Sequence, residues 1–266
     1  PPLVLQMPLE FTAHNIRLDD GTLTKPELGA TMDANPWFVS AKRVLQTVFP
    51  GDKGTYRLAD LGCLEGGYSV EFARLGFRVV GLEIRDSNLA ACHYVKSKTD
   101  LPNLEFIKDD AWNIERYGTF DAIFCCGLLY HLDRPNEFIQ LLSRASSKLV
   151  ILQTHFSVSD GAPEPSSTTK FSLSPLTTNE SLFGRWYTEF AGDAQFENRE
   201  EAKWASWDNR RSFWALREYV LQALAHAGFD LVMEQFDSLG PHIADAMLTG
   251  YYKTDSRGTF VGIKCR

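Results

Sequence analysis

Apolar runs and helical patterns alternate through the first 157 residues of the chain. The runs lie at residues 57–62, 78–84, 104–108, 120–126 and 147–155. Between them, apolar positions at helical spacing predict helices near 67–75, 87–98 and 135–146. Alternating strands and helices indicate a parallel sheet with right-handed crossovers and helices on both of its faces.

The flanking segments have different patterns. Residues 1–55 are predicted to form an extension, with a hairpin around Asp20-Gly21 and a helix that starts at Asn35-Pro36. Residues 158–211 lack periodicity and are rich first in Ser, Thr and Pro and then in aromatic residues, which predicts a long insertion that covers the sheet as a lid. A helix pattern resumes at Ser212, and strands are predicted over FDLVMEQFD and TFVGIKC, with a turn of helix between them. The predicted core is therefore 56–157 with 212–266.

The turn after the first apolar run carries the clearest chemical signal. Gly62 and Gly66-Gly67 let the backbone pass close to a ligand, and Glu83 follows Asp60 by 23 residues, at the end of the second run. An acid at that distance can bind a ribose diol. Asp60 and Glu65 would repel a pyrophosphate but attract a ligand that carries an ammonium and a sulfonium group. The pattern indicates a positively charged, nucleoside-containing cofactor.

The motifs and their order resemble those of the class I S-adenosylmethionine (SAM) methyltransferases. Asp60, Gly62 and Gly66 match the (D/E)xGxGxG motif of that family, and Leu64 departs from it. LEFIK followed by Asp109-Asp110-Ala111-Trp112, and then FDAIFCCGLLYHLDRP, match its later motifs over roughly residues 57–156. The resemblance implies a seven-stranded, mostly parallel Rossmann-like sheet whose last pair is antiparallel, SAM as cofactor and S-adenosylhomocysteine (SAH) as product.

The resemblance also implies a set of cofactor contacts. Glu83 would hold the ribose, Asp110 and the Ala111 backbone the adenine, and Trp112 would pack on the purine. The alternative for Asp109 or Asp110 is a cap on the helix that follows. The full set of candidate cofactor residues is Asp60, Gly62, Cys63, Gly66, Tyr68, Glu83, Ile84, Asp110, Ala111, Cys126 and Gly127.

His131 is the first candidate for a general base, because an imidazole accepts protons near neutral pH. It lies in the turn after the strand that would end beneath the reactive sulfur, where a histidine can also merely shape the turn. Tyr130 is its companion, and His155 is either a second base or a structural residue. Lys42 or Arg43 could bind the cofactor carboxylate or could be solvated.

The acceptor contacts are expected from the aromatic insertion. Flat faces beside amide and guanidinium donors suit a sugar-containing or aromatic metabolite, and the alternatives are a structural subcore and solvated arginines. The candidates are Trp186, Tyr187, Trp207, Asn209 and Arg210, with Trp204 and Arg211 beside them.

Composition narrows the function further. The net charge of −7 over 266 residues argues against nucleic acid as a partner. Five cysteines without CxxC spacing favour reduced thiols in a cytoplasmic protein, and no metal-ligand motif or apolar run long enough for a membrane span is present. The oligomeric state is left open.

We therefore expect a SAM-dependent methyltransferase (EC 2.1.1 class) that O-methylates a small molecule. Two alternatives stay open. GLLYHLDRP also resembles the enzymes that carboxymethylate the wobble uridine of transfer RNA with carboxy-SAM, and a non-catalytic SAM-binding module would share the same motifs.

Overall fold

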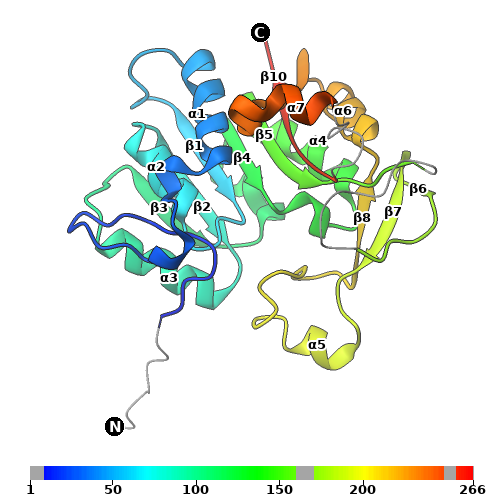
Figure 1. The fold of residues 1–266 in the computed structure, drawn as a ribbon, viewed down its shortest axis with the longest axis horizontal. Coiled ribbons are helices and arrows are strands. Elements are labelled where there is room, and N and C mark those ends of the chain that lie inside the picture. Colours follow the sequence, from blue (N-terminus) through cyan, green and yellow to red (C-terminus); the bar gives the residue numbers. More distant parts are fainter. Residues whose placement is uncertain (1–8, 160–170, 249–255, 266) are drawn as a thin grey trace.

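The computed structural model describes residues 9–159, 171–248 and 256–265, and a seven-stranded sheet forms its centre (Figure 1). The strand order is β3-β2-β1-β4-β5-β10-β9, and β10 runs antiparallel to both of its neighbours. The strands are β1 (Arg57–Leu61), β2 (Arg78–Glu83), β3 (Leu104–Lys108), β4 (Phe120–Cys126), β5 (Ser146–His155), β9 (Leu231–Gln235) and β10 (Arg257–Ile263). The predicted seven-stranded, mostly parallel Rossmann-like sheet is confirmed.

Two apolar cores cover the two faces of this sheet. Successive residues of β1 point to opposite faces, so Leu58 joins one core and Ala59 the other. The first core contains residues of α1 (Pro36–Val48), α2 (Gly67–Arg74) and α3 (Asp86–Ser97). The second contains residues of α4 (Pro135–Ala145) and α6 (Arg217–His226). Helices on both faces leave the carboxyl edge of the parallel strands for a binding site.

Short helices complete the core, and local sequence explains where some of them begin. The Asn35 side chain accepts hydrogen bonds from the backbone N–H groups of Trp37 and Phe38, and so caps α1. The shorter helical elements are η1 (Pro26–Leu28), η2 (Met32–Ala34), η3 (Ala111–Tyr117), η4 (Leu129–His131), η5 (Asp237–His242) and α7 (Ile243–Leu248). The helix turn expected between the last two strands is present as η5 and α7.

The N-terminal extension is attached to the turn after β1. Its expected hairpin is a tight turn at Gly21 closed by one antiparallel bridge, between Arg17 and Leu23. The buried carboxylate of Glu65 accepts hydrogen bonds from the backbone N–H groups of residues 12–14. A buried carboxylate needs such partners, so this contact holds the extension against the core.

The insertion builds a second, antiparallel sheet in the order β6-β7-β8, drawn in yellow-green to yellow beside the main sheet in Figure 1. Its elements are β6 (Thr177–Asn179), β7 (Leu182–Thr188), α5 (Asp193–Glu197) and β8 (Arg211–Ala215). The predicted helix start at Ser212 is wrong, because residues 211–215 pair with β7 and α6 begins at Arg217. Residues 160–170 of the insertion lie outside the described residues.

Among the helices of residues 9–159, 171–248 and 256–265, none is long and apolar enough to cross a bilayer.

Candidate functional site

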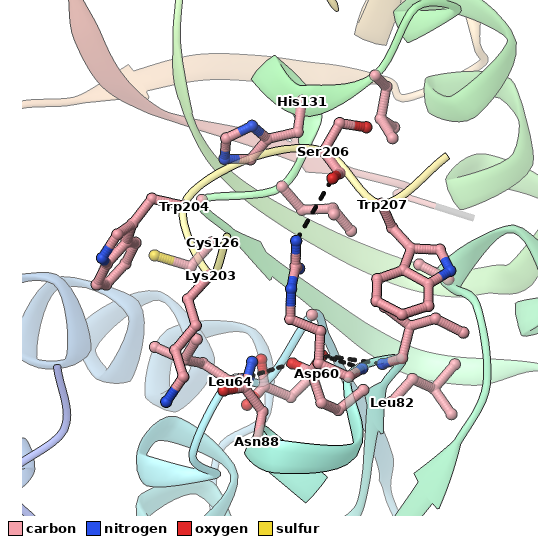
Figure 2. Close-up of a pocket in the computed structure, with 18 of the residues that line it drawn as sticks. Asp60, Leu64, Leu82, Asn88, Cys126, His131, Lys203, Trp204, Ser206 and Trp207 are labelled. Atoms are coloured by element: carbon pink, nitrogen blue, oxygen red, sulfur yellow. Dashed lines mark hydrogen bonds between the residues drawn. The ribbon is translucent and has the colours of Figure 1, made fainter. Parts of the chain in front are cut away.

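A cavity of about 380 Å³ lies where β1, β2 and β4 end and residues 203–209 of the insertion cover them (Figure 2). This position is the usual ligand site of an open α/β sheet, and the volume is typical of small-molecule sites. The residues that line it come from four parts of the chain. They are Ala13, His14, Asn35 and Trp37 from the extension; Asp60, Gly62, Leu64, Tyr68, 82–85 and Asn88 from the first motifs; 109–112, 126–128 and 130–132; and 203–209 with Arg257.

The floor of the cavity is organised by the carboxylate of Glu83. One oxygen accepts the backbone N–H of Leu64 at 2.9 Å, and the other accepts those of Ile84 and Arg85 at 2.9 Å. Burial raises the pKa of Glu83, while the backbone donors and the Arg85 guanidinium favour its ionised form. The side chain is therefore fixed at the cavity wall, and Oε2, which accepts one backbone N–H where Oε1 accepts two, has lone-pair capacity for a ligand hydroxyl.

Asp60 lies beside this turn with its carboxyl group buried. Its Oδ2 accepts the hydroxyl of Ser69 at 2.6 Å. Burial raises the pKa of Asp60 to about 7, and the nearby negative charge of Glu83 acts in the same direction. A positive ligand group in this part of the cavity would be attracted by the ionised form of Asp60.

Asp110 has two roles in the geometry. Its side chain accepts the N–H of Trp112 at 2.9 Å and so caps η3, which is the capping role that the sequence offered as the alternative to adenine binding. It also lines the cavity, where burial raises its pKa and the facing carboxylate of Asp208 acts in the same direction. Capping thus fixes the carboxyl group at the cavity wall and is compatible with ligand contact.

The roof of the cavity is the covering loop, residues 199–209, and Arg85 holds it in place. The guanidinium donates to the backbone carbonyls of Ala202 at 2.9 Å and Ala205 at 2.8 Å, with a longer bond to Ser206 (dashed line in Figure 2). It also lies 5.4 Å from the ring of Trp207. Desolvation lowers the pKa of Arg85, but its carbonyl partners compensate the buried charge.

His131 lies under the other end of the covering loop and contacts Glu189, which follows β7. Its Nδ1 is 3.0 and 3.1 Å from the two carboxylate oxygens. The Glu189 side chain is completely buried, and its Oε2 also accepts the N–H of Ser206 at 2.9 Å. Because a carboxylate only accepts, Nδ1 is the nitrogen that donates to Glu189, and in the neutral imidazole Nε2 is then the proton acceptor.

The end of the cavity nearest β10 is lined by aromatic rings and one guanidinium. The Arg257 guanidinium is 5.2 Å from the Trp37 ring and 5.9 Å from the Tyr130 ring. Its Nη2 donates to the Gln153 side chain at 3.0 Å. A second cavity of about 260 Å³ shares Trp37 and Arg257 with the first and is lined by His155 and by residues of β9, η5 and β10.

Comparisons with known proteins agree with this geometry. Residues 58–148 match a family model described as a methyltransferase domain. Residues 58–148 are therefore similar to a methyltransferase domain, and the sheet around them has a Rossmann-like order. A protein of Geobacillus sp. (strain WCH70), named as a methyltransferase, is 32% identical over 96 residues, which are 35% of this chain and 38% of that protein. A ubiquinone biosynthesis O-methyltransferase of Colwellia psychrerythraea (strain 34H) is 30% identical over 89 residues, 33% of this chain and 36% of that protein.

Solved structures resemble the whole fold of this methyltransferase domain. The N-terminal domain of EvdMO1 with SAH bound has a TM-score of 0.58 and 24% identity, covering 86% of this chain and 81% of that one. The glycopeptide N-methyltransferase MtfA, complexed with SAM, has a TM-score of 0.51 and 14% identity, covering 86% and 94%. At these identities the likeness concerns the fold. The chain spans less than two fifths of the length of the curated relatives above.

Most of the residues expected at the cofactor site of the methyltransferase domain lie in the cavity wall. They are Asp60, Gly62, Tyr68, Glu83, Ile84, Asp110, Ala111, Cys126 and Gly127, and Tyr130, His131, Trp207 and Asn209 join them. Cys63 and Gly66 lie outside it. The Cys63 thiol faces that of Cys92 in the core, and a Cβ on Gly66 would meet Phe106 at 2.5 Å, so this glycine permits close packing.

Trp112 and Trp204 also line this cavity, and the other candidates lie outside it. His155 donates from Nδ1 to the Ser256 carbonyl and stacks on Trp214, and burial lowers its pKa to about 4. Arg43 pairs with Asp237. Trp186 packs on Phe213 and Arg211. Tyr187 packs on Phe171 and Trp214, and Arg210 forms an ion pair with Asp193. Trp186, Tyr187 and Arg210 therefore make contacts within the insertion and with the strand that follows it.

Sequence patterns missed several residues that the fold brings to the cavity or to His131 in its wall. The position of Arg85, two residues after Glu83, is the sequence feature that could have indicated its place in the site. His14, Asn35, Glu189 and Arg257 come from segments without a recognised motif. Metal chemistry was not expected, and within the described ranges no group of three or more His, Cys, Asp or Glu side chains is arranged to hold an ion.

Proposed function

We propose that this protein is a SAM-dependent methyltransferase that methylates a hydroxyl group on a small-molecule acceptor, a sugar-containing or aromatic metabolite. Support for the cofactor comes from the cavity at the sheet edge, from Glu83 at its floor, and from the SAH and SAM bound in the fold neighbours EvdMO1 and MtfA. When bound, SAM would supply a methyl group already activated by its sulfonium.

The residues of the cavity fit such a cofactor. Glu83 would accept the ribose hydroxyls, and Asp110 would accept the adenine amino group, with Trp112 near the purine. Asp60, with its raised pKa, would face the positively charged end. Arg257, which lines the cavity, would be the partner of the cofactor carboxylate in place of Lys42 or Arg43.

The observation that carries the choice of a hydroxyl acceptor is the state of His131. A hydroxyl is a poor nucleophile, and its proton must leave as the new bond forms. His131 lines the cavity with Nδ1 held by a carboxylate, so its Nε2 is left as a proton acceptor. Tyr130, whose carbonyl accepts the Trp214 indole N–H, would position the acceptor beside it.

We further propose that the insertion acts as a lid over the acceptor. The covering loop roofs the cavity and would keep water from the reacting groups. Trp207 and Asn209 line the cavity from this loop, which supports acceptor contacts by these two residues.

The test is label transfer from methyl-tritiated SAM by the purified protein, with cell extract separated into small-molecule, RNA and protein fractions. We expect label in the small-molecule fraction. Label in RNA would overturn the small-molecule assignment in favour of the transfer-RNA alternative, for which carboxy-SAM would be tried next. No label in any fraction, together with tight SAH binding, would favour a non-catalytic module.

A variant pair tests the base. His131→Ala should abolish most transfer while SAH affinity is unchanged, because the imidazole acts on the acceptor. His93→Ala, an exposed histidine on α3, is the control and should leave both unchanged. Equal transfer by His131→Ala and wild type would remove His131 from the mechanism.

A further inference from the structure

The contact between His131 and Glu189 joins two parts of the chain that are 58 residues apart. His131 comes from η4 of the core, whereas Glu189 follows β7 of the insertion. A fully buried carboxylate is costly unless its partners replace water. The partners here are the His131 imidazole and the Ser206 N–H. The insertion thus delivers a negative charge to the ring at the cavity wall.

We propose that Glu189 is a positioning residue for His131, and that closing the covering loop is what orients the base. This inference rests on the proposed function. In the step assigned to the pair, the acceptor O–H bond breaks and an N–H bond forms at His131 Nε2. Glu189 remains ionised, keeps the other proton on Nδ1, and stabilises the imidazolium. Without it the imidazole is free to present a protonated Nε2, which cannot accept a proton.

The covering loop holds both the ring and the backbone of His131. Its Ser206 N–H fixes the carboxylate of Glu189 at 2.9 Å. Its Asn209 side chain donates to the His131 carbonyl at 2.8 Å and accepts the Ser206 hydroxyl at 2.8 Å. Opening the loop would remove these donors together, so the loop and the base form one unit.

Arg85 links this unit to the cofactor side of the cavity. The backbone N–H of Arg85 donates to Glu83, and its guanidinium holds the carbonyls of Ala202 and Ala205 in the covering loop. The covering loop is therefore bound at one end through Arg85, which contacts Glu83, and at the other end through His131. Losing the Arg85 contacts should release the loop and, with it, the orientation of His131.

Kinetics test the role of Glu189. Glu189→Gln should lower kcat by about 100-fold or more, by analogy with carboxamide replacement in a His–Asp pair. KM and SAH affinity should stay within about threefold, since the change is confined to the transition state. Glu189→Asp should recover part of kcat. Glu197→Gln, an exposed glutamate in α5, is the matched control and should behave as wild type. A KM effect without a kcat effect would overturn the proposal.

A readout independent of activity separates this inference from the proposed function. In ¹⁵N-histidine NMR spectra, wild-type His131 should show the Nδ1–H tautomer, and Glu189→Gln should shift it toward Nε2–H. An unchanged tautomer in a folded Glu189→Gln variant would overturn the positioning role. A changed tautomer in a protein that methylates nothing would support the positioning role and reject the proposed function.

The coupling to the loop has its own test. Arg85→Gln should lower kcat and shift the His131 tautomer in the same direction as Glu189→Gln, because the loop is released. The fold-decrease in kcat of the double variant should be smaller than the product of the fold-decreases of the two single variants, as expected for residues that act through one unit. Fully multiplicative effects, or an unshifted tautomer in Arg85→Gln, would show that loop and base are independent.

Discussion

The backbone N–H of Leu64 donates to the carboxylate of Glu83 at 2.9 Å from a left-handed conformation, with φ of 53°. Leu64 occupies the place of the middle glycine of the family motif, a position where φ above zero is ordinary for glycine and unfavourable for leucine. The turn thus keeps the backbone shape of the motif without its glycine. The Leu64 bond to Glu83 stabilises that shape, and the N–H groups of Ile84 and Arg85 hold the carboxylate in place.

Substitutions at Leu64 should follow backbone strain and not side-chain size. A β-branched residue is more unfavourable than leucine at positive φ. The free energy of unfolding of Leu64→Val should therefore be about 1–3 kcal/mol below that of wild type, and its unfolding should occur at a lower urea concentration. Leu64→Gly should be closer to wild type, because relief of strain offsets the lost side-chain contacts. Urea unfolding of the three proteins measures the order. A Leu64→Val variant as stable as wild type would contradict the strain at this turn.

Loss of the Glu83 carboxylate should weaken cofactor binding. Glu83→Gln replaces one acceptor oxygen with a donor, so a backbone N–H loses its partner and the proposed ribose contact would be weakened. We expect SAH to bind at least about tenfold more weakly, which corresponds to about 1.4 kcal/mol. Isothermal titration calorimetry measures this, and Glu105→Gln, exposed on β3, is the control. An unchanged dissociation constant would remove Glu83 from the site.

His14 should make stability depend on pH. Its Nδ1 accepts the Gly67 N–H at 3.0 Å, and burial lowers the pKa of His14 to about 4 from 6.5. Above pH 6.5 His14 is neutral in both the folded and the unfolded chain. Below pH 6.5 the unfolded chain binds a proton on His14 first, so the free energy of unfolding decreases as the pH is lowered. His14→Asn keeps an acceptor but does not titrate.

The comparison of these two proteins isolates the effect. Between pH 7 and 4.5, wild type should lose roughly 2 kcal/mol more unfolding free energy than His14→Asn. Urea unfolding at both pH values measures the difference. Parallel losses in the two proteins would show that His14 can be protonated in the folded state.

Asp60 should couple cofactor binding to a proton. Burial raises its pKa to about 7, so near neutral pH part of the free protein carries a protonated Asp60. A positively charged ligand nearby favours the ionised form, and its binding should therefore release a proton. SAM affinity should fall as pH decreases below 7.

Calorimetry in buffers of different ionisation enthalpy detects this proton directly. Asp60→Asn cannot titrate, so its binding enthalpy should not depend on the buffer. Equal buffer dependence in wild type and Asp60→Asn would mean that another group releases the proton.

Much of the fold could be predicted because local patterns of apolar and polar residues determine its strands and helices. The apolar runs and the helical spacing between them located β1 to β5 and α2 to α4 within a few residues. The positions of Asp60, Glu83 and Asp110 at strand ends followed from the same reasoning, since parallel strands place their carboxyl ends at one edge. For these elements the sequence alone was sufficient.

Tertiary structure decided what the local patterns could not. The run SFWAL carries four consecutive apolar residues after Ser212, so its spacing alone does not separate strand from helix, and pairing with β7 made residues 211–215 a strand. The contact of His131 with Glu189 spans 58 residues, and that of Arg85 with Ala205 spans 120. Neither lies in a motif. Such contacts exist only once the insertion folds over the sheet edge and its buried charges find partners.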